Sequence, residues 1–218
     1  MTPQMGLTGS ALLFLATHFL LSHPLRAPLV RAMGEKAFRG VYSLVAIVTF
    51  GMMIYFYRII GDEPQLWPVS EAYQIAGTLL MWLGSILFVG SFVGNPALPG
   101  ARPPSGGPAG VLTITRHPMM WGFALWAAVH LLVVATPKAL VFDTAVIVMA
   151  LMGSLMQDRK KQRLMGETWH EWSAQTAFVP FTRGLASPGL FALVGGTVLL
   201  LVATLLHPLP VGPWRWIG

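Results

Sequence analysis

The sequence contains no cysteine and few charged residues. None of its 218 residues is Cys, and Asp, Glu, Lys and Arg together make up 10% of the chain. The absence of cysteine excludes disulfides, zinc–thiolate sites and a thiolate-ligated haem. Soluble domains typically carry about 25% charged residues. The shortage of charge therefore indicates that most of this chain faces lipid or other helices rather than water.

Long apolar segments account for over half of the sequence. A helix that crosses the roughly 30 Å hydrocarbon core needs about 20 apolar residues. The candidate spans are Gly6–Leu21, Val41–Ile60, Ala72–Gly94, Met119–Thr136, Leu140–Gln157 and Gly189–Leu206. We therefore predict an all-α fold: a polytopic membrane helix bundle of about six transmembrane helices, forming a single domain over residues 1–218.

Two connecting segments have a character of their own. The Pro- and Gly-rich segment Asn95–Gly110 predicts irregular structure. The segment Asp158–Gln175 has Leu164, Thr168, Trp169 and Trp172 near helical spacing, with basic residues on the other side. This pattern predicts an amphipathic helix in the membrane interface, bent at Gly166.

The basic residues predict the orientation in the membrane. Eleven of the fourteen Lys and Arg residues lie in the first, third and fifth connections, and basic loops stay on the cytoplasmic side. We therefore predict a multi-pass protein of the bacterial inner membrane with both termini periplasmic. In this orientation Gln65 and Gly218 are outside and Ser105 is inside. Because the net charge of +6 follows this asymmetry, we expect a lipid bilayer and no nucleic acid as its partner.

Two histidines, His18 and His130, fall within predicted spans. Ionisable residues inside a bilayer are costly and usually have a function. Neutral imidazole is a natural ligand of haem iron, and two imidazoles give a six-coordinate site. The alternative is a buried histidine that is hydrogen-bonded to a backbone carbonyl or to a Ser or Thr on the next helix. Periodicity does not decide between these interpretations, because the two residues are on separate helices.

A second motif, Thr115-Arg116-His117-Pro118, precedes the fourth span. Pro118 suits a first helical turn, whose free N–H groups favour an anion. The planar fork of Arg116 suits a phosphate, a propionate or a carboxylate. The alternative is a basic interfacial anchor beside a helix start.

With these residues in view, the chain resembles the NnrU family of bacterial membrane proteins and its plant relative, the zeta-carotene isomerase. The resemblance covers nearly the whole chain. It is carried by Thr17-His18, Ser22, Arg26, Gly34-Glu35-Lys36-Ala37-Phe38-Arg39, Gln65-Leu66-Trp67, Thr115-Arg116-His117-Pro118, Gly122, Leu125-Trp126, His130, Asp158-Arg159, Gly166-Glu167, Val179-Pro180-Phe181 and His207-Pro208.

The resemblance implies a haem b with His18 and His130 as its metal ligands. In the isomerase a cysteine three residues before the second histidine can replace a ligand, and this chain has Ala127 there. On this basis we expect Arg26 and Arg116 to pair with the haem propionates and Trp126 to pack against the macrocycle. The implied activity is redox-linked isomerisation or electron transfer on a lipophilic substrate such as a polyene, with a link to nitric oxide or denitrification. The sequence identifies no catalytic residue.

A broader similarity leaves an alternative open. Arg116-His117-Pro118, Gly122 and the ending Val179-Pro180-Phe181 also resemble the integral membrane methyltransferases, such as isoprenylcysteine carboxyl methyltransferase. In that interpretation Arg116, His117 and the segment from Glu167 to Glu171 bind S-adenosylmethionine. A third class, a haem-free scaffold for assembling a nitrogen-oxide reductase, is motivated by the family resemblance alone.

Overall fold

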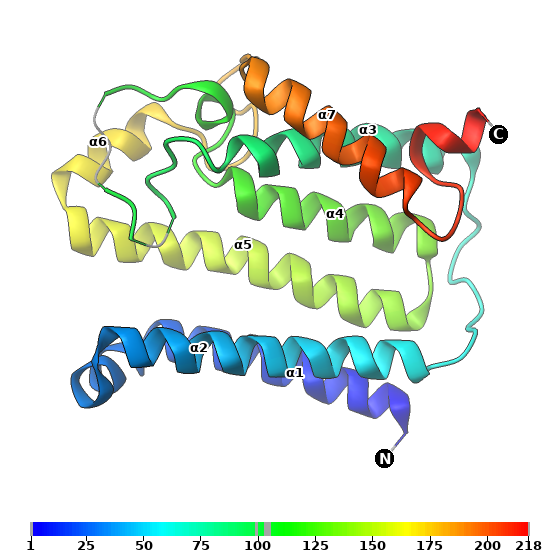
Figure 1. Ribbon diagram of the computed structural model, residues 1–218, viewed down its shortest axis with the longest axis horizontal. Helices are drawn as coiled ribbons and strands as arrows, with labels where there is room; N and C mark the ends of the chain where they lie inside the picture. Colours follow the sequence, from blue (N-terminus) through cyan, green and yellow to red (C-terminus); the bar gives the residue numbers. More distant parts are fainter. Residues whose placement is uncertain (1, 99, 103–105, 218) are drawn as a thin grey trace. The chain divides into compact units, whose positions relative to one another are not determined.

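All regular secondary structure is helical in the residues that the computed structural model describes, which are 2–98, 100–102 and 106–217 (Figure 1). No strand occurs in these residues, which confirms the all-α prediction. The elements are α1 Pro3–Ser22, α2 Arg26–Ile59, α3 Glu71–Gly90, η1 Gly110–Thr113, α4 Pro118–Val134, α5 Pro137–Met165, α6 Glu167–Gln175, α7 Leu190–Leu205 and η2 Gly212–Trp216.

Each of the six predicted apolar segments corresponds to one helix. Among the described residues, α1, α2, α3 and α5 are long and apolar enough to cross a membrane. Helices α4 and α7 are also apolar but have only 17 and 16 residues. At 1.5 Å per residue they extend about 25 Å, somewhat less than the bilayer core. The chain is therefore a membrane protein with four helices of spanning length and two shorter apolar helices.

The predicted interfacial helix is only partly as expected. Gly166 has φ 56° and separates α5 from α6, so the bend is confirmed. However, Asp158–Met165 belongs to α5 rather than to a separate amphipathic helix. Arg, Lys, Gln, Leu and Met, which fill most of this stretch, are good helix formers, so nothing stops α5 before the glycine. The segment Asn95–Gly110 is irregular in its described parts, and residues 99 and 103–105 lie outside them.

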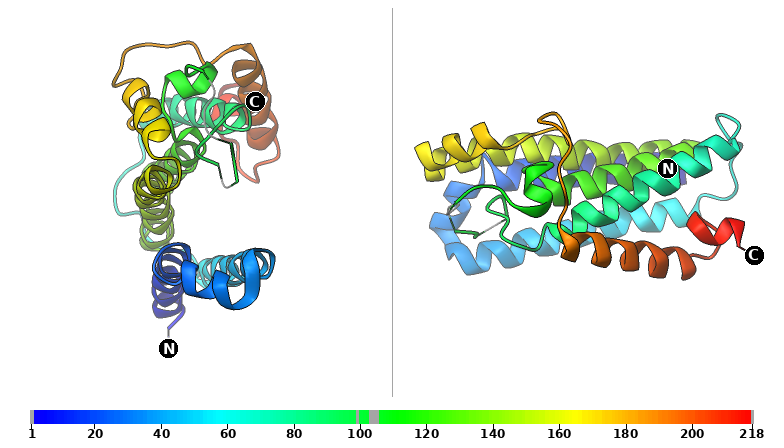
Figure 2. Two further views of the ribbon diagram at one scale, coloured as in Figure 1. Left: turned by 90° about the vertical axis from the view of Figure 1, so that its left-hand side faces the viewer. Right: turned by 90° about the horizontal axis from the view of Figure 1, so that it is seen from above.

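Contacts divide the chain into two compact units. The first comprises the chain up to Pro68 together with Val134–Met149, and the second comprises Val69–Val133 and the chain from Ala150 onward. In the first unit α1 and α2 lie side by side (Figure 2). The hydroxyl of Thr2 accepts the Met5 N–H at 3.3 Å and caps the start of α1. The ammonium of Lys138 donates to the carbonyls of Ile60 and Gly61 and thereby caps the end of α2.

The turn between α1 and α2 changes one expectation about the site. Helix α1 ends at Ser22, and Pro24 follows, which has no backbone N–H with which to continue a helix. Arg26 begins α2 instead. The spacing of eight residues between His18 and Arg26 would place them on one face of a continuous helix, but they are on different helices.

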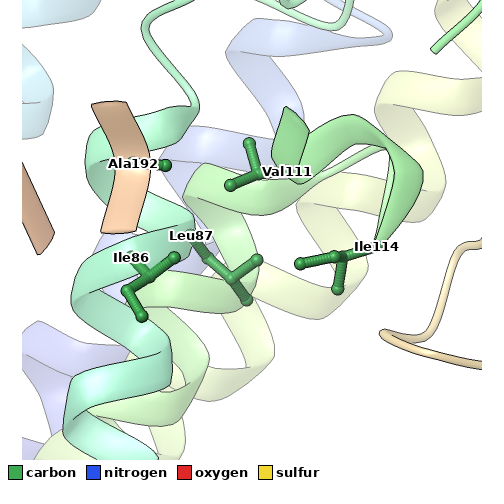
Figure 3. Packing of buried hydrophobic residues seen from close by; sticks show 5 residues of the cluster. All are labelled: Ile86, Leu87, Val111, Ile114 and Ala192. Atoms are coloured by element: carbon green, nitrogen blue, oxygen red, sulfur yellow. The ribbon is translucent and has the colours of Figure 1, made fainter. Parts of the chain in front are cut away.

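In the second unit α3 and α7 pack against each other (Figures 1 and 2). A cluster of buried apolar side chains joins them to the segment that precedes α4 (Figure 3). The cluster consists of Ile86, Leu87, Val111, Ile114 and Ala192. This packing fixes the backbone directly before the Thr115-Arg116-His117-Pro118 motif.

Candidate functional site

His18 lies in α1, in the first unit, among aromatic side chains. Its ring centroid is 4.2 Å from that of Phe14 and 5.5 Å from that of Tyr42. Its Nδ1 is 2.9 Å from the carbonyl oxygen of Phe14, one helical turn earlier. Ser22, one turn later, donates its hydroxyl to the His18 carbonyl. These contacts hold the half-buried imidazole in one orientation.

His130 lies in α4, in the second unit, and has the same local arrangement. Its ring centroid is 4.2 Å from that of Trp126, and its Nδ1 is 2.8 Å from the Trp126 carbonyl oxygen. The aromatic residue and the carbonyl are again supplied by the residue four positions earlier. Trp126, which we expected to pack against a macrocycle, therefore packs against the candidate ligand.

The hydrogen bond that each histidine makes to a backbone carbonyl fixes its tautomer. A carbonyl oxygen only accepts, so Nδ1 must carry the proton in each ring and Nε2 must hold the lone pair. Neither Nε2 atom has a hydrogen-bond partner among the described residues. Metal-ligating histidines commonly donate their other N–H to a carbonyl in this way. The carbonyl contact expected of a merely structural histidine is thus present, and it leaves the coordinating nitrogen available.

Each histidine is described within its own unit, so their pairing stays a prediction. No group of three or more His, Asp or Glu side chains that could hold a metal ion occurs in the described part of the chain. Haem iron takes its four equatorial ligands from the macrocycle and needs only one or two protein side chains. The residues present therefore fit a haem better than a bare metal ion.

Arg26 and Glu35 form an ion pair in the first unit. One Nη atom of Arg26 donates to both Glu35 carboxylate oxygens, at 2.8 and 2.9 Å. The guanidinium also lies 5.6 Å from the ring centroid of Phe38. A bend at Gly34, with φ 81° and ψ 160°, brings Glu35 back toward Arg26. Only glycine adopts such a conformation without strain.

The motif at the start of α4 is the most highly connected polar site in the second unit. Arg116 donates from Nε and one Nη to the same oxygen of Asp158, at 2.9 and 2.7 Å. His117 is 2% exposed, and its Nε2 lies 2.7 Å from the other oxygen of that carboxylate. One carboxylate on α5 therefore holds two consecutive side chains of the motif.

Backbone contacts join this motif to the segment that follows α6. The Arg116 N–H donates to the Ala177 carbonyl at 2.8 Å. The Thr115 hydroxyl and the Trp121 indole N–H both donate to the Phe178 carbonyl. The Phe181 N–H also donates to the Ile114 carbonyl, so the motif and the Val179-Pro180-Phe181 segment are held together by hydrogen bonds. Arg116, which the alternative interpretation treats as a basic anchor beside a helix start, is bound to Asp158.

A shallow hollow of about 410 Å³ borders this network. Arg116, Asp158, Arg159 and Arg163 line it, together with three residues that include Trp169. Glu167 and Glu171, which the methyltransferase interpretation needs, are exposed and do not belong to its lining. His117, which that interpretation also needs, is turned to Asp158.

Sequence reasoning missed Asp143. It is 3% exposed in the apolar part of α5, and it makes no hydrogen bond to a described residue. The neighbouring Phe142 ring packs on Phe50 and Tyr57 in the first unit. The indication was visible in the sequence, because Asp143 is the only acidic residue inside the six predicted spans.

These features define an all-helical membrane protein with two oriented histidines and a buried polar network beside α4. The chain belongs to the NnrU family: the family model described as "NnrU protein" matches residues 6–214.

Two plant proteins are similar over most of the chain. The 15-cis-zeta-carotene isomerase of Arabidopsis thaliana is 25% identical over 194 residues, which cover 83% of this chain and 50% of that protein. The Zea mays isomerase of the same name is 25% identical over 164 residues, covering 69% and 43%. The chain thus spans about half the length of these relatives or slightly less. No solved structure matches the chain. Nothing in these comparisons supports the methyltransferase alternative.

Proposed function

We propose that this chain binds haem b through His18 and His130 and carries out redox-linked isomerisation of a lipophilic polyene. The similarity to two 15-cis-zeta-carotene isomerases supports the reaction type and the substrate class. The apolar helices supply the membrane environment in which such a substrate dissolves. Electron transfer to another lipophilic molecule is the related activity that the same site would allow.

The observation that carries the proposal is that each of the two histidines makes the same type of hydrogen bond to its own helix. Each Nδ1–H is donated to the carbonyl four residues earlier, which leaves Nε2 as a lone-pair donor in a fixed direction. Phe14 and Trp126 restrict rotation of the two rings, with centroids 4.2 Å away in both cases. This preorganisation lowers the entropic penalty of forming the iron–imidazole bonds.

Bound haem would supply one-electron chemistry. His18 and His130 would hold its iron through their Nε2 atoms. Ala127 has no group that can coordinate iron, so it would not take part in holding the haem. No described residue points to nitrogen-oxide chemistry, so the link to denitrification rests on the family resemblance alone.

The two arginines differ in their capacity to bind propionates. Arg26 uses one Nη atom for Glu35, so its Nε and its other Nη have donors left. Arg116 uses Nε and both Nη atoms for Asp158 and the Thr176 carbonyl. We therefore favour Arg26 over Arg116 as a propionate partner.

The charge distribution supports a location in the bacterial inner membrane with both termini periplasmic. Eleven of the fourteen basic residues lie in the connections proposed to be cytoplasmic. In this orientation Arg26 is at the cytoplasmic side.

The decisive experiment is the absorption spectrum of protein purified from haem-replete cells, with a pyridine haemochrome assay. We expect a Soret band that is lost in both His18→Ala and His130→Ala. His23→Ala and His170→Ala are the matched controls and should keep the band. A colourless wild-type protein would overturn the haem proposal.

The reaction is tested separately. Membranes containing the chain are incubated with a 15-cis polyene, and the isomers are separated by chromatography. We expect conversion that requires His18 and His130. Bound haem without any conversion would favour the electron-transfer activity instead.

A further inference from the structure

The second unit contains a larger pocket, whose lining includes none of the residues proposed to bind haem. It has a volume of about 690 Å³, within the range of roughly 300–1,000 Å³ that is usual for small-molecule sites. Residues from the end of α3, the segment before η1, α6 and the start of α7 form its walls. They include Gly90, Val111, Trp172 and Ala192.

Trp172 carries an unused hydrogen-bond donor in this wall. The residue is 4% exposed, and its indole Nε1–H is buried without a partner. A buried donor left unpaired is destabilising, so native proteins nearly always satisfy it. Trp82, Trp121 and Trp214 each donate their indole N–H to an acceptor in the same unit. The unpaired indole N–H of Trp172 thus indicates a hydrogen-bond acceptor that comes from outside the chain.

The charge of the pocket favours an anionic acceptor. Arg102 is exposed, lines the pocket and forms no ion pair with a described residue. None of the described lining residues is Asp or Glu. A carboxylate would take one hydrogen bond from the indole and pair with the guanidinium, which restores the partner that each group lacks.

The mouth of the pocket favours a ligand with an apolar tail. Phe92 and Val93 at the end of α3 are 59% and 58% exposed, and Leu190 and Phe191 at the start of α7 are 76% and 62% exposed. In a membrane protein such side chains face lipid. A ligand that enters here therefore comes from the bilayer and brings its polar end toward Trp172 and Arg102.

We propose that this pocket binds a long-chain carboxylate, a free fatty acid, with its carboxylate at Trp172 and Arg102 and its alkyl chain leaving past Phe92 and Phe191. The pocket volume suits one alkyl chain rather than the two of a phospholipid. The proposal does not depend on haem or on isomerase activity.

Photo-crosslinking with a diazirine-labelled fatty acid tests this site in the full-length protein in nanodiscs. We expect mass spectrometry to locate the label in residues 90–93 and 190–192, with excess oleate suppressing it. Oleyl alcohol has the same chain without the charge and should compete about tenfold less well, the effect of losing one charge-assisted hydrogen bond.

Two substitutions examine the head-group contacts. Trp172→Phe keeps an aromatic ring but removes the N–H, and Arg102→Gln removes the charge at an exposed position that the fold does not need. Each should weaken oleate competition about tenfold. Trp169→Phe, at the neighbouring buried indole that does not line this pocket, should leave it unchanged. If Trp172→Phe does not fold, Arg102→Gln alone carries this comparison.

Three results would overturn the proposal. Equal competition by oleate and oleyl alcohol would exclude carboxylate recognition. Displacement of the label by phosphatidylglycerol as effectively as by oleate would make the ligand a phospholipid. Labelling spread evenly over the lipid-facing helices, including α2, would mean that the probe reports contact with the bilayer only.

Discussion

Arg116 and Asp158, 42 residues apart in the sequence, form an ion pair in which two guanidinium nitrogens lie 2.9 and 2.7 Å from one carboxylate oxygen. The side chains are only 15% and 19% exposed, and His117 takes the second oxygen. Because both oxygens are used, Asp158 links the start of α4 to the end of the apolar part of α5. The two candidate residues found before α4 are thus positioned by a third, Asp158, to which the sequence analysis gave no role beyond the family resemblance and the start of the predicted interfacial helix.

Asp158→Asn should destabilise the protein. The amide keeps the size of the side chain but loses the charge, so Arg116 and His117 each lose a charge-assisted hydrogen bond. We expect a loss of about 1.5–3 kcal/mol, measured by thermal unfolding in detergent. Glu171→Gln is the control, because Glu171 is exposed and has no ion-pair partner in the described residues. Equal stability of the two variants would contradict a structural role for the ion pair.

Gly34→Ala should also destabilise the protein, for a backbone reason. Gly34 has φ 81°, and a Cβ added there would have nothing within 4 Å, so the penalty is conformational alone. We expect a loss of about 1–2 kcal/mol. Gly40→Ala, in the regular part of α2 and also in open space, should instead be neutral or stabilise by up to about 1 kcal/mol. Thermal unfolding of the pair distinguishes them, and equal shifts would exclude the bend.

Asp143→Leu should make the protein more stable. A buried carboxyl without a hydrogen-bond partner loses its hydration and forms no hydrogen bond to replace it. A leucine has no polar group to desolvate, so we expect the free energy of unfolding to rise by about 1–3 kcal/mol, measured by thermal unfolding. Thr144→Leu, at the exposed neighbouring position, should change little. A strong loss of stability in Asp143→Leu would mean that the carboxyl has a partner, such as a bound ligand or water. Stabilisation with reduced polyene conversion would identify it as a functional group.

The proposed orientation predicts which side of the membrane each loop occupies. Gln65→Cys should react with an impermeant maleimide in intact cells, and Gly107→Cys should react only after permeabilisation. Both positions are exposed, and the chain has no native thiol. Ser105 and Gly218, which the charge pattern assigns to opposite sides, lie outside the described residues, so Gly107 stands for the third connection. Fast labelling of Gly107→Cys in intact cells would contradict the orientation.

The sequence predicted the existence of the six apolar helices better than the residues at which they begin and end. The six apolar segments correspond to six helices because length and hydrophobicity alone predict them. Helix α5 continues to Met165 because nothing before Gly166 interrupts a helix, and neither hydrophobicity nor charge marks that point. The turn after Ser22 could have been predicted from Pro24, which would have separated Arg26 from the helix of His18.

Only the local contacts of the candidate site could be predicted from the sequence. The carbonyl bonds of His18 and His130 involve residues four positions earlier, so helical geometry was enough to anticipate them. The role of Asp158 depends on its contacts with Arg116 and His117, which are 42 and 41 residues away and which spacing cannot reveal. The orphaned N–H of Trp172 depends on what its neighbours fail to provide, and no sequence pattern encodes that.

Helix α5 has a consequence for the order in which the protein is made. Its first half belongs to the first unit, while α3 and α4, which belong to the second, are synthesised before it. The ring of Phe142 and the ammonium of Lys138 reach Tyr57 and the end of α2 only once α5 has left the ribosome. Helix α2 therefore lacks these contacts with α5 while the next two helices are synthesised and inserted.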